Sequence, residues 1–92
     1  MNVRIFSDGQ YRVPESAQER LNELDRKAVE AVDADNEEAF LSSFHALVEH
    51  IHATGERLAD DDLEPSDVML PPPDITLAEA RGGFSGEGLI PD

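Results

Sequence analysis

The spacing of hydrophobic residues changes along the chain, and each change marks the border of a predicted element. Alternation of apolar and polar residues over 2–13 predicts a β-hairpin, because successive side chains of a strand point to opposite faces. Apolar residues three and four apart over 16–32 and 36–54 predict two amphipathic helices joined by a short turn. A proline-rich extended segment at 63–75 and a short helix at 76–82 complete a single small domain over 1–92.

The register of the hairpin follows from the requirement that one face be apolar. A three-residue loop ending at Gly9, with this glycine in the left-handed conformation, pairs Val3 with Val13 and Ile5 with Tyr11. All four apolar side chains then lie on one face, where they can join a core. A two-residue loop mixes apolar and charged residues on both faces, so we expect the longer loop.

Capping signals set the expected starts of the helices. Ser16, Asp35 and Thr76 are each followed three residues later by glutamate, which is the spacing of a capping box. Gly55 is expected to end the second helix. An apolar stripe on this helix forms core or, in part, contacts a partner helix. The stripe consists of Phe40, Phe44, Leu47, Val48 and Ile51.

The segment 63–75 combines proline with an apolar run, Val68-Met69-Leu70. Pro65 and the three prolines from Pro71 onward exclude a helix and fix much of the backbone. A strand in this segment is expected at a sheet edge, because proline cannot donate to a ladder. The predicted fold class is α+β, with an N-terminal β-hairpin packed on an antiparallel helical hairpin, the extended segment as an edge strand and a short C-terminal helix.

The composition is strongly acidic, with 21 acidic residues against seven basic ones and a formal net charge of -14. Such a surface repels nucleic acid and anionic lipid, and it attracts a basic protein surface. Because the acids are spread along the chain, they fit a halophilic surface adapted to high salt as well as a role in binding one partner. The sequence shows no signal peptide and no apolar run long enough to span a membrane, so we expect a cytoplasmic protein without direct membrane insertion.

Candidate chemistry is sparse. The chain has no cysteine, no phosphate-binding loop and no pattern of paired acid and base, so we expect neither an enzyme nor a cofactor. His45, Glu49 and His52 share one face of the second predicted helix, at a spacing that suits a metal site. Because no fourth ligand is evident and this face is expected to be exposed, a small metal-binding protein is the alternative and not the first hypothesis.

A protein-binding role fits the remaining features better. Extended backbone fixed by proline, with protruding apolar side chains, is typical of a docking element. We therefore predict a protein partner, with neighbouring acids steering its approach and one aromatic residue on the solvent side of the hairpin adding to the surface. The predicted partner-binding residues are Val68, Met69, Leu70, Pro71, Asp60, Asp61, Asp62 and Phe6. A self-associating structural domain, and hence a homo-oligomer, is a further alternative.

The most distinctive motifs are PSDVMLPPPD at 65–74 and GEGLIPD at 86–92, which follow a hairpin containing GQYRV at 9–13. Through these motifs the whole chain resembles the PspA-associated protein family, PspAA. The resemblance implies a non-enzymatic adaptor or regulator that binds phage-shock protein A (PspA), a coiled-coil, membrane-associated protein of the envelope-stress response. It also implies recruitment to the inner face of the membrane through that partner, and it assigns no catalytic residue.

Overall fold

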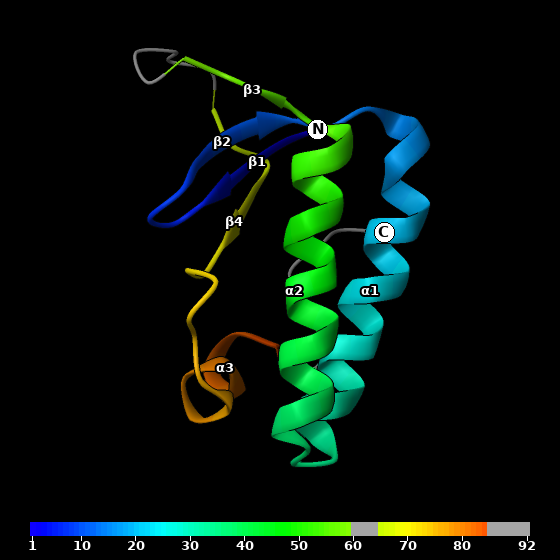
Figure 1. The fold of residues 1–92 in the computed structure, drawn as a ribbon, viewed down its shortest axis with the longest axis vertical. Coiled ribbons are helices and arrows are strands. Elements are labelled where there is room, and N and C mark those ends of the chain that lie inside the picture. The colour runs from blue at the N-terminus through cyan, green and yellow to red at the C-terminus, as the bar shows by residue number, and fades with distance from the viewer. Residues whose placement is uncertain (60–64, 85–92) are drawn as a thin grey trace.

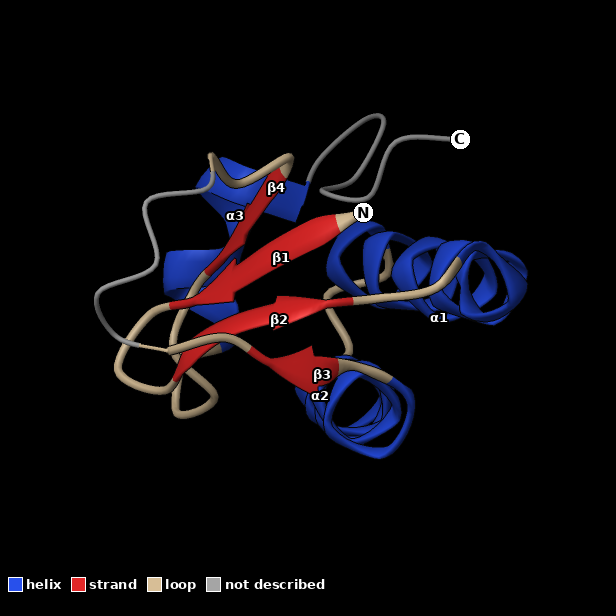
Figure 2. Ribbon diagram, turned by 90° about the horizontal axis from the view of Figure 1, so that it is seen from above, coloured by secondary structure: helices blue, strands red, loops and turns tan. Residues whose placement is uncertain are grey.

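A four-stranded sheet lies beside the upper part of an antiparallel helical hairpin, and a short third helix lies beside its lower part (Figure 1). This computed structural model describes residues 1–59 and 65–84, and within them it confirms the predicted α+β fold. Figure 2 shows the sheet nearly face-on, in the strand order β3-β2-β1-β4. The elements are β1 (Asn2–Ile5), β2 (Gly9–Arg12), α1 (Glu15–Asp33), α2 (Glu37–Thr54), β3 (Glu56–Arg57), β4 (Val68–Leu70) and α3 (Leu77–Phe84).

The hairpin of β1 and β2 forms as predicted, but its register differs from the prediction by two residues. Val3 lies opposite Tyr11, and Ile5 lies opposite Gly9. The predicted partners were Val13 and Tyr11, each two positions further along β2. The prediction of the hairpin is therefore right in its faces and wrong in its pairing.

The wrong register has a simple cause, since side-chain alternation repeats every two residues. A shift of two keeps the same side chains on the same face, so the apolar pattern cannot choose between the two registers. The turn makes the choice: the Asp8 amide donates to the Ile5 carbonyl at 3.0 Å, and the left-handed residue is Ser7, with φ of 71°. The apolar face itself is buried, as predicted, and consists of Val3, Ile5, Tyr11 and Val13.

The turn between α1 and α2 places the cap one residue later than predicted. Asp35 adopts a left-handed φ of 57°, and its amide donates to the Val32 carbonyl at 3.0 Å. The Asn36 amide donates to the Ala31 carbonyl at 2.9 Å, which completes the hydrogen bonding of a left-handed helix end. The Asn36 side chain then accepts a hydrogen bond from the Ala39 amide at 3.1 Å. Asn36, and not Asp35, therefore caps α2.

The other two capping signals have opposite outcomes. Helix α1 follows Pro14, and no side chain caps it, so the predicted role of Ser16 is wrong. At α3 the capping box forms: the Thr76 amide donates to the Glu79 carboxylate at 3.2 Å, and the Glu79 amide donates to the Thr76 hydroxyl at 3.3 Å. Pro14 at the cap of α1 offers no side-chain acceptor, and its carbonyl accepts a hydrogen bond from the Ala17 amide at 3.0 Å. Its ring fixes the entry of the chain into the helix.

The end of α2 leads into β3, a strand that the hydrophobic pattern does not reveal. Gly55 caps α2 with φ of -86°, so it is not needed for a left-handed conformation. A Cβ atom on Gly55 would lie 2.7 Å from the Ile51 carbonyl oxygen and 3.2 Å from Tyr11 Cβ, so glycine lets the chain pass close to β2. Strand β3 then pairs antiparallel with β2. Its residues, Glu56 and Arg57, are both exposed and charged, and therefore carry no apolar signal.

The extended segment supplies β4, which lies parallel to β1, with Val68 beside Val3. The start of this pairing is fastened by two hydrogen bonds of 2.8 Å, from the Asn2 amide to the Asp67 carboxylate and from the Asp67 amide to the Asn2 carbonyl. No strand of the described residues pairs with the other side of β4, so the predicted edge position is confirmed. Residues 63 and 64 of the predicted segment lie outside the described residues.

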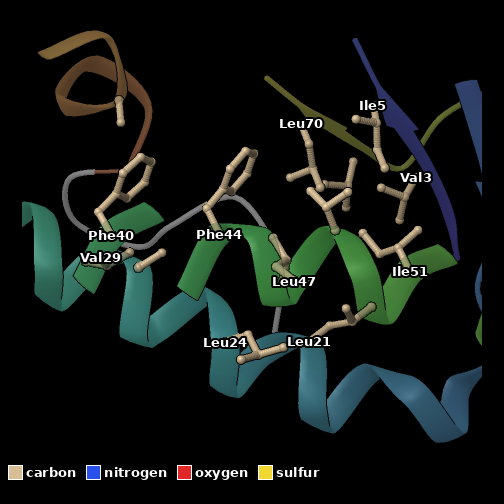
Figure 3. Packing of buried hydrophobic residues seen from close by; sticks show 14 of the residues in the cluster. Val3, Ile5, Leu21, Leu24, Val29, Phe40, Phe44, Leu47, Ile51 and Leu70 are labelled. Carbon is tan, nitrogen blue, oxygen red and sulfur yellow. The ribbon is translucent and has the colours of Figure 1, made fainter. Parts of the chain in front are cut away.

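The core surrounds α2, which lies between α1 and the sheet (Figure 3). Val3 and Leu70 point toward α2 from the strands, and Leu21 of α1 approaches it from the opposite side. Phe40 and Phe44 stack with their ring centroids 5.8 Å apart. The predicted apolar stripe is entirely buried, so it forms core and does not face a partner. Its members are Phe40, Phe44, Leu47, Val48 and Ile51.

Candidate docking surface

Strand β4 directs its three side chains alternately to the two faces of the sheet. Val68 and Leu70 lie in the core, with exposed fractions of 4% and 0%, whereas Met69 is 52% exposed. Of these three residues, all predicted to bind a partner, Val68 and Leu70 contribute their side chains to the core of this fold, so their role in binding stays a prediction. Met69 is available at the surface, and the following Pro71 is partly buried.

Phe6 lies close to β4 at the end of β1. Its amide donates to the Leu70 carbonyl at 3.1 Å, so the pairing of β1 with β4 extends into the turn. Arg4 is the register partner of Met69 and is exposed two residues before Phe6. Phe6, with 48% exposure, and Met69 are the exposed large hydrophobic side chains of the described residues. We call Arg4, Phe6 and Met69 the outer-face patch.

Asp8 fastens the turn that carries Phe6. Its carboxylate accepts a hydrogen bond from the Tyr11 hydroxyl at 3.1 Å and lies 2.5 Å from Nε2 of His52 on α2. The guanidinium of Arg57 in β3 lies 3.6 Å from the same carboxylate and donates to the Asp8 carbonyl at 3.0 Å. Side chains from β2, β3 and α2 thus meet at one residue, and they hold the tip of the hairpin in place.

These contacts also set the charge of Asp8. Burial raises the pKa of the Asp8 carboxyl, but the hydrogen bonds of His52 and Tyr11 and the charges of His52 and Arg57 outweigh burial and lower the pKa below its usual 3.8. Burial, the hydrogen bond to Asp8 and the negative charge of Asp8 raise the pKa of Tyr11 above its usual 10.0. Asp8 is therefore ionised and Tyr11 protonated at neutral pH, which makes this pair a fixed anchor.

Comparison with known proteins identifies the relationship of the chain. One protein family, described as PspA-Associated protein, matches residues 1–92. The chain belongs to the PspA-associated protein family. No curated protein and no solved structure matches it. The family resemblance that rests on the two sequence motifs is thus confirmed over the whole chain.

The histidines predicted as metal candidates in this PspA-associated protein have separate neighbours. Nε2 of His45 lies 3.2 Å from the Pro73 carbonyl oxygen, whereas His52 contacts Asp8. Among residues 1–59 and 65–84, no group of three His, Asp or Glu side chains could hold a metal ion. The helical spacing of His45, Glu49 and His52 therefore does not produce a metal site in the described part of the chain.

Two further predictions for this PspA-associated protein concern the acids that steer a partner and the insertion of the chain into a membrane. Asp60, Asp61 and Asp62, predicted to steer a partner, lie outside the described residues, so their role stays a prediction. None of the helices in the described ranges has the length and apolar character to cross a bilayer.

The hydrophobic pattern of this PspA-associated protein does not predict the contacts that surround Asp8 at the turn of the β1–β2 hairpin. It marks Asp8 as a turn residue and His52 as a metal candidate, and nothing connects either with Arg57. These contacts depend on β3, which has no hydrophobic signal, and they join positions as far apart as 49 residues. Arg4 is predictable as an outward residue of the hairpin, but its neighbour Met69 depends on the pairing of β1 with β4.

Proposed function

We propose that this protein is a non-enzymatic adaptor that binds PspA through the outer-face patch and regulates the assembly of PspA in the envelope-stress response. Membership of the PspA-associated protein family supports the choice of partner. The exposure of Met69 on β4 and of Phe6 in the turn that follows β1 carries the choice of surface. Large apolar side chains that a fold leaves exposed together mark interaction sites.

The patch is held in place before any partner arrives. The Phe6 amide is bound to the Leu70 carbonyl, and contacts to Asp8 fix the following turn. Met69 lies between two side chains that are buried in the core. Preorganised groups lose little conformational freedom on association, so their apolar area contributes more fully to affinity. In the proposed role PspA is a coiled-coil, membrane-associated protein that recruits this adaptor from the cytoplasm to the inner face of the membrane.

A binding measurement with full-length PspA tests the proposal. Met69→Asp and Phe6→Asp should each weaken binding by roughly tenfold or more, because each replaces buried apolar contact by a desolvated charge. Ser42→Asp is the matched control, since Ser42 is exposed on α2 and the substitution adds the same charge. Circular dichroism of every variant checks that the substitution leaves the protein folded.

The possible outcomes test the proposed partner and the proposed binding surface separately. Absence of binding between the wild-type protein and PspA would refute the proposed function. Binding that Met69→Asp, Phe6→Asp and Ser42→Asp leave equally strong would place the PspA-binding surface elsewhere on the molecule.

A further inference from the structure

Arg4, in the outer-face patch, forms no ion pair with any acid of the described residues, although the chain is rich in acids. Its guanidinium is exposed and donates one hydrogen bond, at 3.2 Å, to the side-chain oxygen of Gln10, a neutral group. In the part of the chain that the structure describes, no carboxylate lies within ion-pair distance of Arg4, whereas Arg20 pairs with Glu23 at 2.8 Å and Arg57 approaches Asp8. In a chain with a net charge of -14, Arg4 is thus a cation that no acid of the described residues pairs with, and it lies next to the exposed side chains of Phe6 and Met69.

The acids closest to Arg4 along the strands are engaged by other groups. Asp8 is held by Tyr11, His52 and Arg57. Asp67, which precedes Met69 by two residues, accepts a hydrogen bond from the Asn2 amide. Among residues 1–59 and 65–84, therefore, no acid pairs with Arg4, and its positive charge can pair with a group that approaches from outside.

The surroundings of Arg4 suit an approaching side chain. An open depression at the tip of the hairpin is lined by Arg4, Ile5, Phe6, Ser7, Asp8 and Gly9. Met69 lies directly across from Arg4 on β4, and Phe6 lies two residues beyond it. The carboxylate of Asp8 also belongs to this lining, but it is held by Tyr11, His52 and Arg57. A side chain that binds between Phe6 and Met69 meets the cation of Arg4 beside two apolar groups. A matching partner surface carries a carboxylate next to apolar side chains.

The shape of the partner follows from the edge of the sheet. Addition of a partner strand to β4 is unfavourable, because β4 has three residues and is followed directly by three prolines, which lack amide donors. The face of the sheet presents the patch without this obstacle. A helix laid on that face can present an apolar residue and an acid one turn apart.

We infer that the outer-face patch binds a helix of PspA whose surface combines apolar residues with an acid, and that Arg4 pairs with this acid. The inference rests on the proposed function and specifies its chemistry. It also places a cation, Arg4, at the centre of the contact, in a protein that is acidic as a whole. The acid of the partner is desolvated between Phe6 and Met69, so its pairing with Arg4 determines which helix face fits.

Charge reversal of Arg4 tests the inference. Arg4→Glu should weaken binding to full-length PspA by roughly tenfold or more, because two carboxylates then face one another in the contact. Arg26→Glu is the matched control: Arg26 is exposed on α1, forms no ion pair among the described residues, and undergoes the same change of charge. Its binding should stay within about twofold of wild type. A set of PspA variants, each with one surface Glu or Asp changed to Lys, should contain one that restores binding to Arg4→Glu.

Each outcome bears on the inference or on the proposed function separately. If Met69→Asp fails to bind while Arg4→Glu binds as well as Arg26→Glu, the inference is wrong and the proposed function stands. If the wild-type protein does not bind PspA, the proposed function fails and the inference fails with it. If Arg4→Glu instead abolishes a dimer that sedimentation detects in the wild-type protein alone, the patch is occupied by a second copy of this chain and the inference is overturned.

Discussion

Asp8 joins the tip of the hairpin to two distant parts of the chain. Its carboxylate contacts the Tyr11 hydroxyl, the His52 ring and the Arg57 guanidinium, and its carbonyl accepts a further bond from Arg57. Bonds to an ionised acceptor are stronger than bonds between neutral groups. An ionised side chain two residues after Phe6 therefore holds the turn in place, together with the backbone bonds from Phe6 to Leu70 and from Asp8 to Ile5.

The removal of this charge should destabilise the protein in a pH-dependent way. Asp8→Asn should lower the free energy of unfolding by about 1–2 kcal/mol at neutral pH, because the bonds from His52 and Tyr11 lose their ionised acceptor. The folded-state pKa of Asp8 lies below the unfolded value of 3.8, so this stabilisation is complete above that value and disappears as the pH falls through the folded-state pKa. Denaturant titrations over a range of pH measure the difference between variant and wild type.

The control for this experiment is Asp74→Asn, which removes the same charge from an exposed residue. We expect it to change stability by less than about 0.5 kcal/mol at all pH values. A difference between wild type and Asp8→Asn that stays constant into the acid range would contradict the role given to the Asp8 charge.

At the scale of elements, one residue of the turn between the long helices, Asn36, both ends α1 and caps α2. The Asn36 amide closes the end of α1 through the Ala31 carbonyl, and the Asn36 side chain opens α2 through the Ala39 amide. The connection is therefore short, since it spans only 34–36, and it sets how α1 and α2 face one another.

Substitution of this residue should show that the cap contributes stability. Asn36→Ala should cost about 1 kcal/mol of unfolding free energy, because the first turn of α2 loses a partner for the Ala39 amide. Ser16→Ala, at a position with the spacing of a capping box but no capping bond, should change stability by less than about 0.5 kcal/mol. Thermal and denaturant unfolding of both variants compares them. A loss for Ser16→Ala as large as that for Asn36→Ala would show that the cap of α1 was assigned wrongly.

The elements differ in how far the sequence predicts them, and the reason is physical. Long periodic segments such as α1 and α2 are predictable, because their apolar spacing has only one helical interpretation. The hairpin register is not, since a shift of two residues preserves the buried face and contacts of Asp8 decide between the registers. Strand β3 is not predictable either, because its two residues are exposed and charged and give no apolar pattern. Capping spacing predicts α3 correctly and α1 incorrectly, since competition from Pro14 is not visible in the spacing.

At the scale of the whole molecule, the main constraint is charge. A net charge of -14 on a chain of 92 residues produces repulsion that opposes the compact state. The exposed faces of the helices carry many of these acids, and few bases compensate them: Glu23 is the acid that both Arg20 and Lys27 approach. Ions that screen the repulsion between these acids should therefore increase the stability of the folded state.

Stability should accordingly rise with salt. Between about 0.05 M and about 1 M NaCl, the Debye length falls severalfold, so repulsion among exposed acids weakens and the unfolding temperature should increase by several degrees. A variant with Glu19, Glu30 and Glu49 changed to Gln removes three exposed negative charges, and its unfolding temperature should depend less on salt. Thermal unfolding followed by circular dichroism measures both proteins. Equal salt dependence in the two would show that repulsion between these acids does not limit stability.

The docking surface belongs to the same scale, and the sequence predicts only part of it. Met69 and Phe6 are both identifiable as candidates, because one interrupts a proline-rich segment and the other faces away from the apolar side of the hairpin. Their proximity depends on the pairing of β1 with β4, which joins residues up to 65 positions apart. No short-range pattern contains that information. The position of Arg4 next to Met69 therefore follows from the folded structure and not from a pattern in the sequence.

The parallel pairing of β1 with β4 has a consequence for the order of events during synthesis. Strands β1 and β2 emerge from the ribosome first, and β4 emerges only after both long helices have been made. Until then one edge of β1 is unpaired, and Arg4 and Phe6 are present without Met69. The outer-face patch comes into existence when the last strand joins the sheet. A partner that recognises all three residues therefore distinguishes finished molecules from nascent and partly unfolded ones.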